Sequence, residues 1–106
     1  MAELATDERV ACRTPNPGRP GTTRIPKWKF DLVRNAILEV LRESDAKFSE
    51  LTDLVRGRLI PSDLGRLGSL GWHVATVKLE MEVREEIRRI PGSKPQVLSI
   101  GGSKDS

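Results

Sequence analysis

The segment from residue 72 to residue 86 most constrains the fold, because its sequence fits both a strand and a helix. Residues 77–83 alternate apolar and polar side chains, which is the period of two that a strand requires. On a helical wheel the segment also shows two apolar stripes, Val74, Val77 and Met81 on one side and Trp72, Ala75, Leu79 and Val83 on the other. Lys, Leu, Glu and Met favour helices, so the composition predicts a helix over this segment.

Two more helices are predicted before this one. Apolar residues recur at helical spacing from Trp28 to Leu41, which predicts a helix over about 27–43 that is broken at residues 44–46. Ser49 is the expected N-cap of a second helix over about 49–58, and acidic residues in its first turn suit the helix dipole. Pro61 ends that helix, and the glycine-containing stretch that follows is interpreted as a connector in which Ser62 caps a short helical turn.

A hairpin follows the third helix. Residues 87–90 and 96–100 predict two strands, joined by a turn that contains proline and glycine. Residues 1–25 mix proline, glycine, threonine and charge without a period, which predicts a disordered leader, and residues 102–106 predict a flexible tail. A chain of 106 residues holds one core, so a single domain is expected over 26–101.

Three helices followed by a hairpin form the outline of a winged helix, an α+β fold with a three-helix core and a two-stranded β-hairpin wing. The run 76–82 followed by Ile87-Arg88-Arg89-Ile90 looks like the third helix and first wing strand of many bacterial winged-helix proteins. With residues 28–41, Phe48-Ser49-Glu50-Leu51 and Gly71-Trp72 before it, the pattern resembles a family of small uncharacterised bacterial winged-helix proteins of unknown function, over residues 26–100. Glu85 departs from this pattern, since related sequences often have a glycine there to end the helix.

This resemblance implies a way of binding duplex DNA, with the third helix in the major groove and the wing on the backbone. The expected base contacts are His73, Thr76 and Lys78, near the start of the third helix. The expected phosphate contacts come from the second helix, the connector and the wing, and are Arg56, Arg58, Arg66, Arg88, Arg89 and Lys94. In the leader, Arg13, Arg19 and Arg24 are placed to follow the duplex or enter a minor groove. The first hypothesis is therefore a DNA-binding protein such as a small transcription regulator.

The third helix also supports an alternative, a module for protein–protein interaction or dimerisation that binds no DNA. Between residues 78 and 86, four glutamates outnumber two basic residues, and acids repel phosphate; these glutamates are interpreted as a solvated face. The second apolar stripe needs cover beyond the first two helices, from the wing or from a second copy of the chain. Clustering of the basic residues around the start of the third helix favours DNA, and scattering favours interaction. An accessory role in an RNA-handling complex ranks third.

Other classes of function are disfavoured. The single cysteine, Cys12, has no partner for a disulfide or a metal site and is interpreted as inert. One histidine, no tyrosine, no nucleophile elbow and no phosphate loop argue against an enzyme and against a cofactor, and His73 is given no catalytic role. Trp28 and Trp72 are interpreted as core anchors.

The length of the apolar runs and the N-terminal sequence indicate the expected cellular location. No apolar run approaches the roughly 18 to 20 residues of a membrane span, and the N-terminus lacks the pattern of a secretory signal. A cytoplasmic protein without a membrane partner is therefore expected. The net charge of +3 permits contact with nucleic acid without requiring it.

Overall fold

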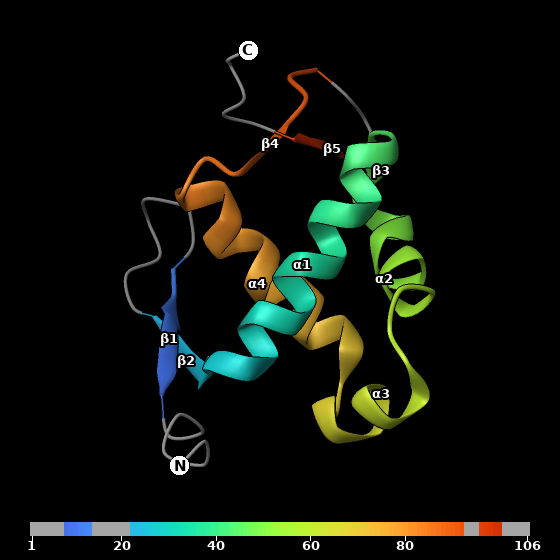
Figure 1. The fold of residues 1–106 in the computed structure, drawn as a ribbon. Helices are drawn as coiled ribbons and strands as arrows, with labels where there is room; N and C mark the ends of the chain where they lie inside the picture. Colours follow the sequence, from blue (N-terminus) through green and yellow to red (C-terminus); the bar gives the residue numbers. More distant parts are fainter. Residues whose placement is uncertain (1–7, 14–21, 93–95, 101–106) are drawn as a thin grey trace.

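The computed structural model describes residues 8–13, 22–92 and 96–100 (Figure 1). In chain order its elements are β1 (Arg9–Cys12), β2 (Thr23–Pro26), α1 (Lys27–Glu43), β3 (Ala46–Lys47), α2 (Phe48–Arg56), α3 (Pro61–Leu67), α4 (Leu70–Val83), β4 (Ile87–Arg89) and β5 (Val97–Ile100). These described residues therefore form an α+β fold with four helices and two small antiparallel sheets, β1–β2 and β3–β5–β4.

The core forms between α1 and α4, which pack against each other (Figure 1). Val33 and Ile37 of α1 and Val77 of α4 are fully buried where the helices meet. Several more elements close the core around them: α2 contributes Leu51 and Val55, and the strands contribute Ile87 and Leu98.

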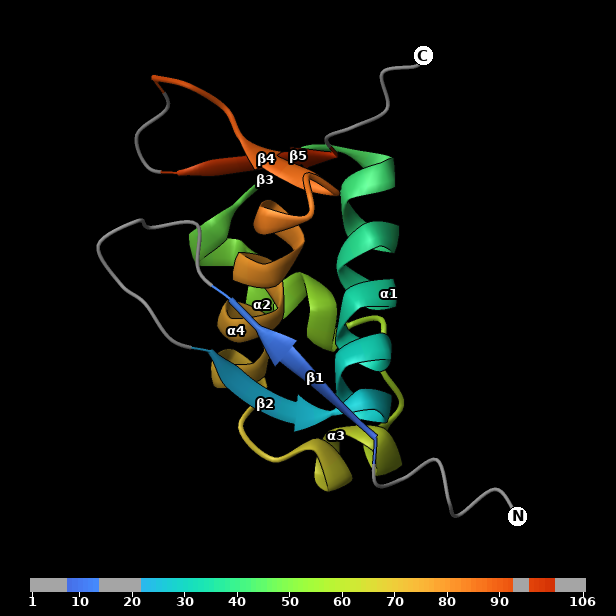
Figure 2. The ribbon, with the colours of Figure 1, turned by 90° about the vertical axis from the view of Figure 1, so that its left-hand side faces the viewer.

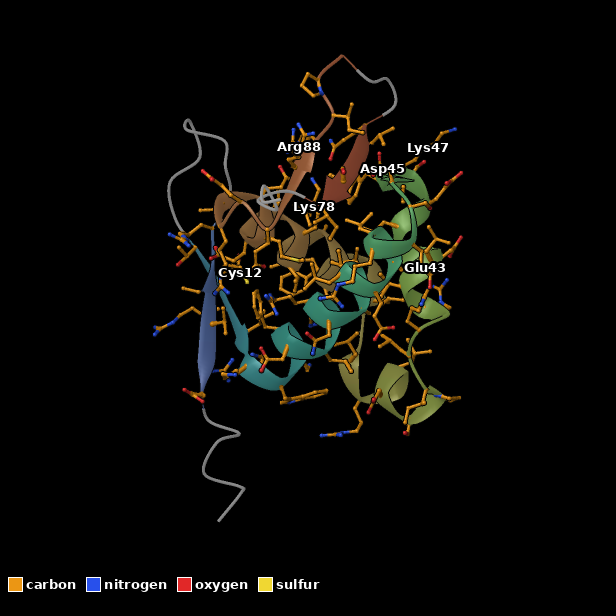
Figure 3. The ribbon with its side chains drawn as sticks, turned by 45° about the horizontal axis from the view of Figure 1, so that its top comes forward. Cys12, Glu43, Asp45, Lys47, Lys78 and Arg88 are labelled. Carbon is orange, nitrogen blue, oxygen red and sulfur yellow. The ribbon has the colours of Figure 1, made fainter. Side chains whose placement is uncertain are left out.

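The three-stranded sheet closes one end of the molecule. The predicted hairpin is confirmed as β4 and β5, and β3 pairs with the other edge of β5 through Ala46 opposite Leu98. Side chains alternate across a strand, so Ala46 and Leu98 face the core while Lys47 and Arg88 point away from it. Figure 3 shows Lys47 and Arg88 at this end of the molecule. The strand β3 was not predicted, because two residues carry no detectable period.

A second antiparallel hairpin precedes α1. In β1 and β2, Val10 lies opposite Ile25 and Cys12 opposite Thr23, and the backbone N–H of Lys27 donates to the carbonyl of Glu8 at 2.8 Å. Figure 2 shows this hairpin crossing beside α1 and α4. Cys12 and Ile25 are 4% and 2% exposed, so the hairpin belongs to the core.

A disordered leader over 1–25 is therefore wrong for residues 9–12 and 23–25. Each strand has only four residues, and its stability comes from packing on α1 and α4, which local sequence does not report. Residues 1–7, 14–21 and the predicted tail 102–106 lie outside the described part of the chain.

The helices lie close to their predicted positions, but two of their N-cap residues differ from the predicted ones. The first helix has the predicted bounds, and residues 77–83 are helical, so the strand interpretation of that segment is excluded. However, α2 begins at Phe48 with Lys47 as its N-cap, so Ser49 lies inside the helix. The connector contains α3, with Pro61 in its first turn, and its N-cap is Ile60 instead of Ser62.

At the end of α4, Glu85 has a backbone conformation that glycine usually adopts. Its φ is 65°, and the N–H groups of Glu86 and Glu85 donate to the carbonyls of Met81 (2.9 Å) and Glu82 (3.0 Å). These two bonds and the left-handed residue form a Schellman motif, which normally has glycine at this position. Glu85 therefore occupies a conformation that costs an L residue about 1 kcal/mol or more.

We expect Glu85→Gly to raise the free energy of unfolding by about 1 kcal/mol, because the gain from relieved backbone strain exceeds the entropy that glycine adds to the unfolded chain. Urea unfolding followed by circular dichroism measures the change. A variant less stable than the parent chain contradicts the left-handed conformation.

We expect Ile37→Ala to lower the free energy of unfolding by about 2 to 5 kcal/mol, because Ile37 is fully buried between helices and its loss leaves a cavity. The same urea titration applies. The matched control is Ile60→Ala, since Ile60 is 60% exposed and its truncation changes stability by about 0.5 kcal/mol at most. Equal effects of the two substitutions contradict the core assignment.

Candidate functional site

The helix α4 presents two apolar faces. It starts after Ser69, whose Oγ accepts the backbone N–H of Trp72 at 3.3 Å as an N-cap. Its inner face carries Leu70, Val74, Val77 and Met81, all buried in the core. Its opposite face carries Trp72, Ala75, Leu79 and Val83, which we call the outer stripe.

The outer stripe is only partly covered by the described residues. Trp72 is 48% exposed, and Ala75, Leu79 and Val83 are partly exposed. The prediction that Trp72 is a core anchor is therefore wrong, because the helix directs it away from α1; its ring instead makes an edge-to-face contact with His73 at 4.9 Å. Trp28 is partly buried, with the guanidinium of Arg66 4.4 Å from its ring centre.

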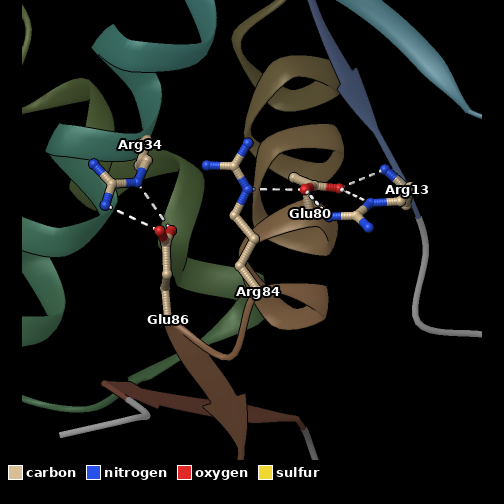
Figure 4. Close-up of polar contacts among 5 residues, drawn as sticks. All are labelled: Arg13, Arg34, Glu80, Arg84 and Glu86. Carbon is tan, nitrogen blue, oxygen red and sulfur yellow. Dashed lines mark hydrogen bonds and ion pairs between the residues drawn. The ribbon is translucent and has the colours of Figure 1, made fainter.

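The carboxylate of Glu80 joins α4 to the N-terminal hairpin (Figure 4). It is 1% exposed and accepts three hydrogen bonds from Arg13: from the backbone N–H at 2.8 Å, from Nε at 3.0 Å and from Nη2 at 2.6 Å. Nε of Arg84, the C-cap residue of α4, donates a fourth at 2.8 Å. Burial alone raises the pKa of Glu80, but the hydrogen bonds from Arg13 and Arg84 outweigh it and lower the pKa to about 2.

Glu82 joins α4 to the strand β4. Its Oε1 accepts Nε of Arg89 at 2.8 Å, and its Oε2 lies 2.7 Å from Nζ of Lys78. The second contact is an ion pair without good hydrogen-bond geometry, since Oε2 has no directed donor among the described residues. Nζ of Lys78 also lies 4.5 Å from the ring centre of Phe48, and burial lowers the pKa of this lysine.

A third glutamate, Glu86, ties the end of α4 to α1. Its two carboxylate oxygens accept Nε and Nη2 of Arg34 at 2.9 and 3.0 Å, which is a bidentate pair (Figure 4). The interpretation of the glutamates as a solvated face is therefore wrong for Glu80 and Glu82, whose side chains are 1% and 7% exposed. Sequence reasoning missed this because Arg13 lies 67 residues from Glu80, and because the pairing of Glu82 with Arg89 depends on how β4 folds back beside α4.

The predicted base contacts do not form an exposed cluster. His73 is buried, with Nδ1 2.7 Å from the carbonyl oxygen of Ser69. Lys78 is 3% exposed beneath the sheet (Figure 3). Thr76 is partly exposed. Two of the three side chains therefore cannot reach a base edge, because the same helical turn that places them near the start of α4 directs them into the core.

The predicted phosphate contacts are scattered. Arg56 pairs with Asp53 on its own helix, Arg58 pairs with Glu39 and Glu43 of α1, and Arg89 pairs with Glu82. Arg66 lies on α3 and Arg88 on β4, at opposite ends of the molecule in Figure 1. Lys94 lies outside the described residues. In the segment predicted as a leader, Arg13 binds Glu80 and Arg24 is exposed on β2, while Arg19 is not described.

The described residues contain no group of three His, Cys, Asp or Glu side chains that could hold a metal ion. Cys12, at the end of β1, is buried, and burial together with the nearby Glu80 carboxylate raises its pKa to about 11. Its thiol therefore stays protonated at neutral pH and is a poor nucleophile. Within the described segments, no helix is both long and apolar enough to cross a membrane.

Residues 9–98 match the model of a family of unknown function (DUF6958), and the chain belongs to that family. The match begins at β1, so the family pattern includes the N-terminal hairpin as well as the helices and the sheet. The predicted resemblance to an uncharacterised family is confirmed to this extent. No curated protein and no solved structure matches the chain.

We expect Glu80→Gln to lower the free energy of unfolding by about 2 kcal/mol at pH 7, because the hairpin loses a charged acceptor. The pKa of Glu80 falls from 4.5 to about 2 on folding, so its contribution is complete above pH 4.5 and is lost as the pH falls toward 2. Urea titrations of both chains between pH 7 and pH 2.5 measure the difference in stability.

The control for this substitution is Glu85→Gln, since Glu85 is exposed at the end of α4. Its effect on stability is expected to stay within about 0.5 kcal/mol at every pH. A difference between wild type and Glu80→Gln that stays constant down to pH 2.5 contradicts the paired carboxylate.

Proposed function

We propose that this protein is a winged-helix domain that acts as a protein-interaction module, with the outer stripe of α4 as its contact surface. The order of α1, α2, α4, β4 and β5 supports the winged-helix assignment. In that scheme α4 is the third helix and the β4–β5 hairpin is the wing. The strand β3, between α1 and α2, pairs with β5 and extends the wing to three strands, and α3 is a short helix between α2 and α4.

The single observation that carries the proposal is the chemistry of the outer stripe. The third helix of a DNA-binding winged helix needs polar or basic side chains on its exposed face. Here that face carries an exposed indole and three partly exposed aliphatic side chains, and the one lysine of the helix is buried. An exposed apolar stripe of this kind is typical of a protein contact.

The distribution of basic residues supports the same choice over DNA binding. Arg58 lies beside α1, where it pairs with Glu43, and Arg66 and Arg88 lie at opposite ends of the molecule. A duplex that touched α4 at either end would therefore meet few of the predicted phosphate contacts. The scattered arrangement therefore favours interaction with protein.

Two measurements on the purified chain test this proposal. In fluorescence anisotropy with random-sequence duplex DNA at about 50 mM salt, we expect a Kd no tighter than about 100 μM, the weak end of nonspecific binding. With the immobilised chain in a lysate of its source organism, we expect Leu79→Glu to abolish capture of a protein that the parent chain retains, since a buried unpaired charge opposes an apolar contact.

The matched control is Asn35→Glu, which adds the same charge at an exposed position of α1. It is expected to leave capture unchanged, and thermal melting confirms that both variants fold. Micromolar DNA binding that weakens steeply with salt, or capture that is indifferent to Leu79→Glu, overturns the proposal.

A further inference from the structure

We propose that the partner of the outer stripe is an acidic amphipathic helix of another protein, seated along α4 with its carboxylates facing two arginine-bearing rims. This inference rests on the proposed function and adds the chemistry of the partner. It follows from the length of the stripe and from the charges that flank it.

The stripe has the dimensions of a helix contact. Trp72 and Val83 are eleven residues apart, which at 1.5 Å per residue places them about 16 Å apart along the axis of α4. This length matches three turns of a partner helix, whose anchors recur at i, i+3 or i+4, and i+7. Ala75 gives the stripe a small residue in its first half, where a larger partner side chain fits beside Trp72.

One rim of the stripe is built on Glu80. With 100° between successive residues of a helix, Glu80 lies on one side of Leu79. Its carboxylate is covered by Arg13 on the side of the stripe, whereas Arg84 approaches it from the α1 side, with its guanidinium 4.8 Å from the ring centre of Phe30. The side chain of Glu80 is 1% exposed and that of Arg13 is 52% exposed, so the exposed charged group of this rim is the guanidinium of Arg13.

The other rim is built on Glu82, on the opposite side of Leu79. Its carboxylate pairs with Lys78 and Arg89. The lysine and the carboxylate are buried, but the side chain of Arg89 is 48% exposed, so the exposed charged group of this rim is again a guanidinium. The stripe is therefore apolar along its centre and has a half-exposed guanidinium group on each side.

Charge complementarity decides between the possible occupants. A second copy of the chain brings the same two positive rims, and like charges would face each other across the contact. Duplex DNA suits the rims but not the apolar centre. A helix with an apolar stripe and flanking glutamates satisfies both, because its carboxylates reach half-exposed guanidinium groups while its apolar side chains cover Trp72 and Leu79.

Three stapled helical peptides with one apolar pattern test this inference on the full chain. Leucines at i, i+3, i+4 and i+7 are flanked by glutamates in the first peptide, by glutamines in the second and by lysines in the third. By fluorescence anisotropy we expect the glutamate peptide to bind at least tenfold more tightly than the lysine peptide, with glutamine between them. The advantage of the glutamate peptide is expected to shrink with added salt.

Two outcomes distinguish the acidic partner from the interaction surface itself. If all three peptides bind equally, the apolar contact stands and the acidic partner is wrong. If none binds below about 1 mM, both the acidic partner and the proposed interaction surface are wrong. Trp72→Ala removes a half-exposed anchor without opening the core, and is expected to weaken the glutamate peptide at least tenfold.

A matched pair of wing variants tests the rim directly. Arg89→Gln removes a rim cation while Lys78 still pairs with Glu82, and is expected to weaken the glutamate peptide about threefold. Arg88→Gln removes the neighbouring charge, which points away from α4 on the other face of the sheet, and is expected to leave affinity unchanged. Equal effects of the two variants contradict the rim.

Discussion

A buried carboxylate joins the N-terminal hairpin to α4. Glu80 is almost fully enclosed, and a charge in that position is unfavourable unless hydrogen-bond donors surround it. Arg13 and Arg84 supply four such donors, and three of them come from the residue that directly follows β1. The contact that stabilises the buried charge of Glu80 therefore also holds the N-terminal hairpin on α4. Two residues of this hairpin, Cys12 and Ile25, stay buried as a result.

The pairing of Glu80 and Glu82 also shapes the surface of α4. Each glutamate lies to one side of the outer stripe and turns its carboxylate toward an arginine or lysine from another turn or another element. The acids that count against an anionic partner in the sequence are thus neutralised within the molecule. What remains at the surface is a partly exposed apolar centre with a half-exposed guanidinium group on each side, and this is the surface that we propose binds protein.

The sequence predicted the long and periodic elements well and the short or cooperative ones poorly. Residues 27–43 form the predicted helix because apolar residues repeat over several turns, and the composition of residues 77–83 correctly favoured helix over strand. The hairpin strands β1 and β2 were missed because four residues carry almost no periodicity and their stability comes from contacts with α1 and α4. The left-handed conformation of Glu85 was not predicted, although the resemblance marked this position as one where related sequences often have glycine.

The candidate site was harder to predict than the fold. The two apolar stripes of α4 were visible on a helical wheel, including Trp72, Leu79 and Val83. The direction in which Lys78 and His73 point depends on the placement of α1 and α2, and the partners of the glutamates lie up to 67 residues away. Local sequence therefore predicted the apolar stripe but not the ion pairs beside it, and these pairs decide which charged groups are exposed there.

The two tryptophans offer the most direct test, because each has one indole N–H resonance and only Trp72 belongs to the outer stripe. We would titrate the isotope-labelled chain with the glutamate-flanked helical peptide and, separately, with duplex DNA, and follow both indole signals by two-dimensional NMR. A shift of the Trp72 signal with the peptide, an unchanged Trp28 signal and no response to DNA are the expected results. If DNA shifts the Trp28 signal or the amide signals of β4 and β5, while the peptide leaves the Trp72 signal unchanged, the proposed contact surface is contradicted.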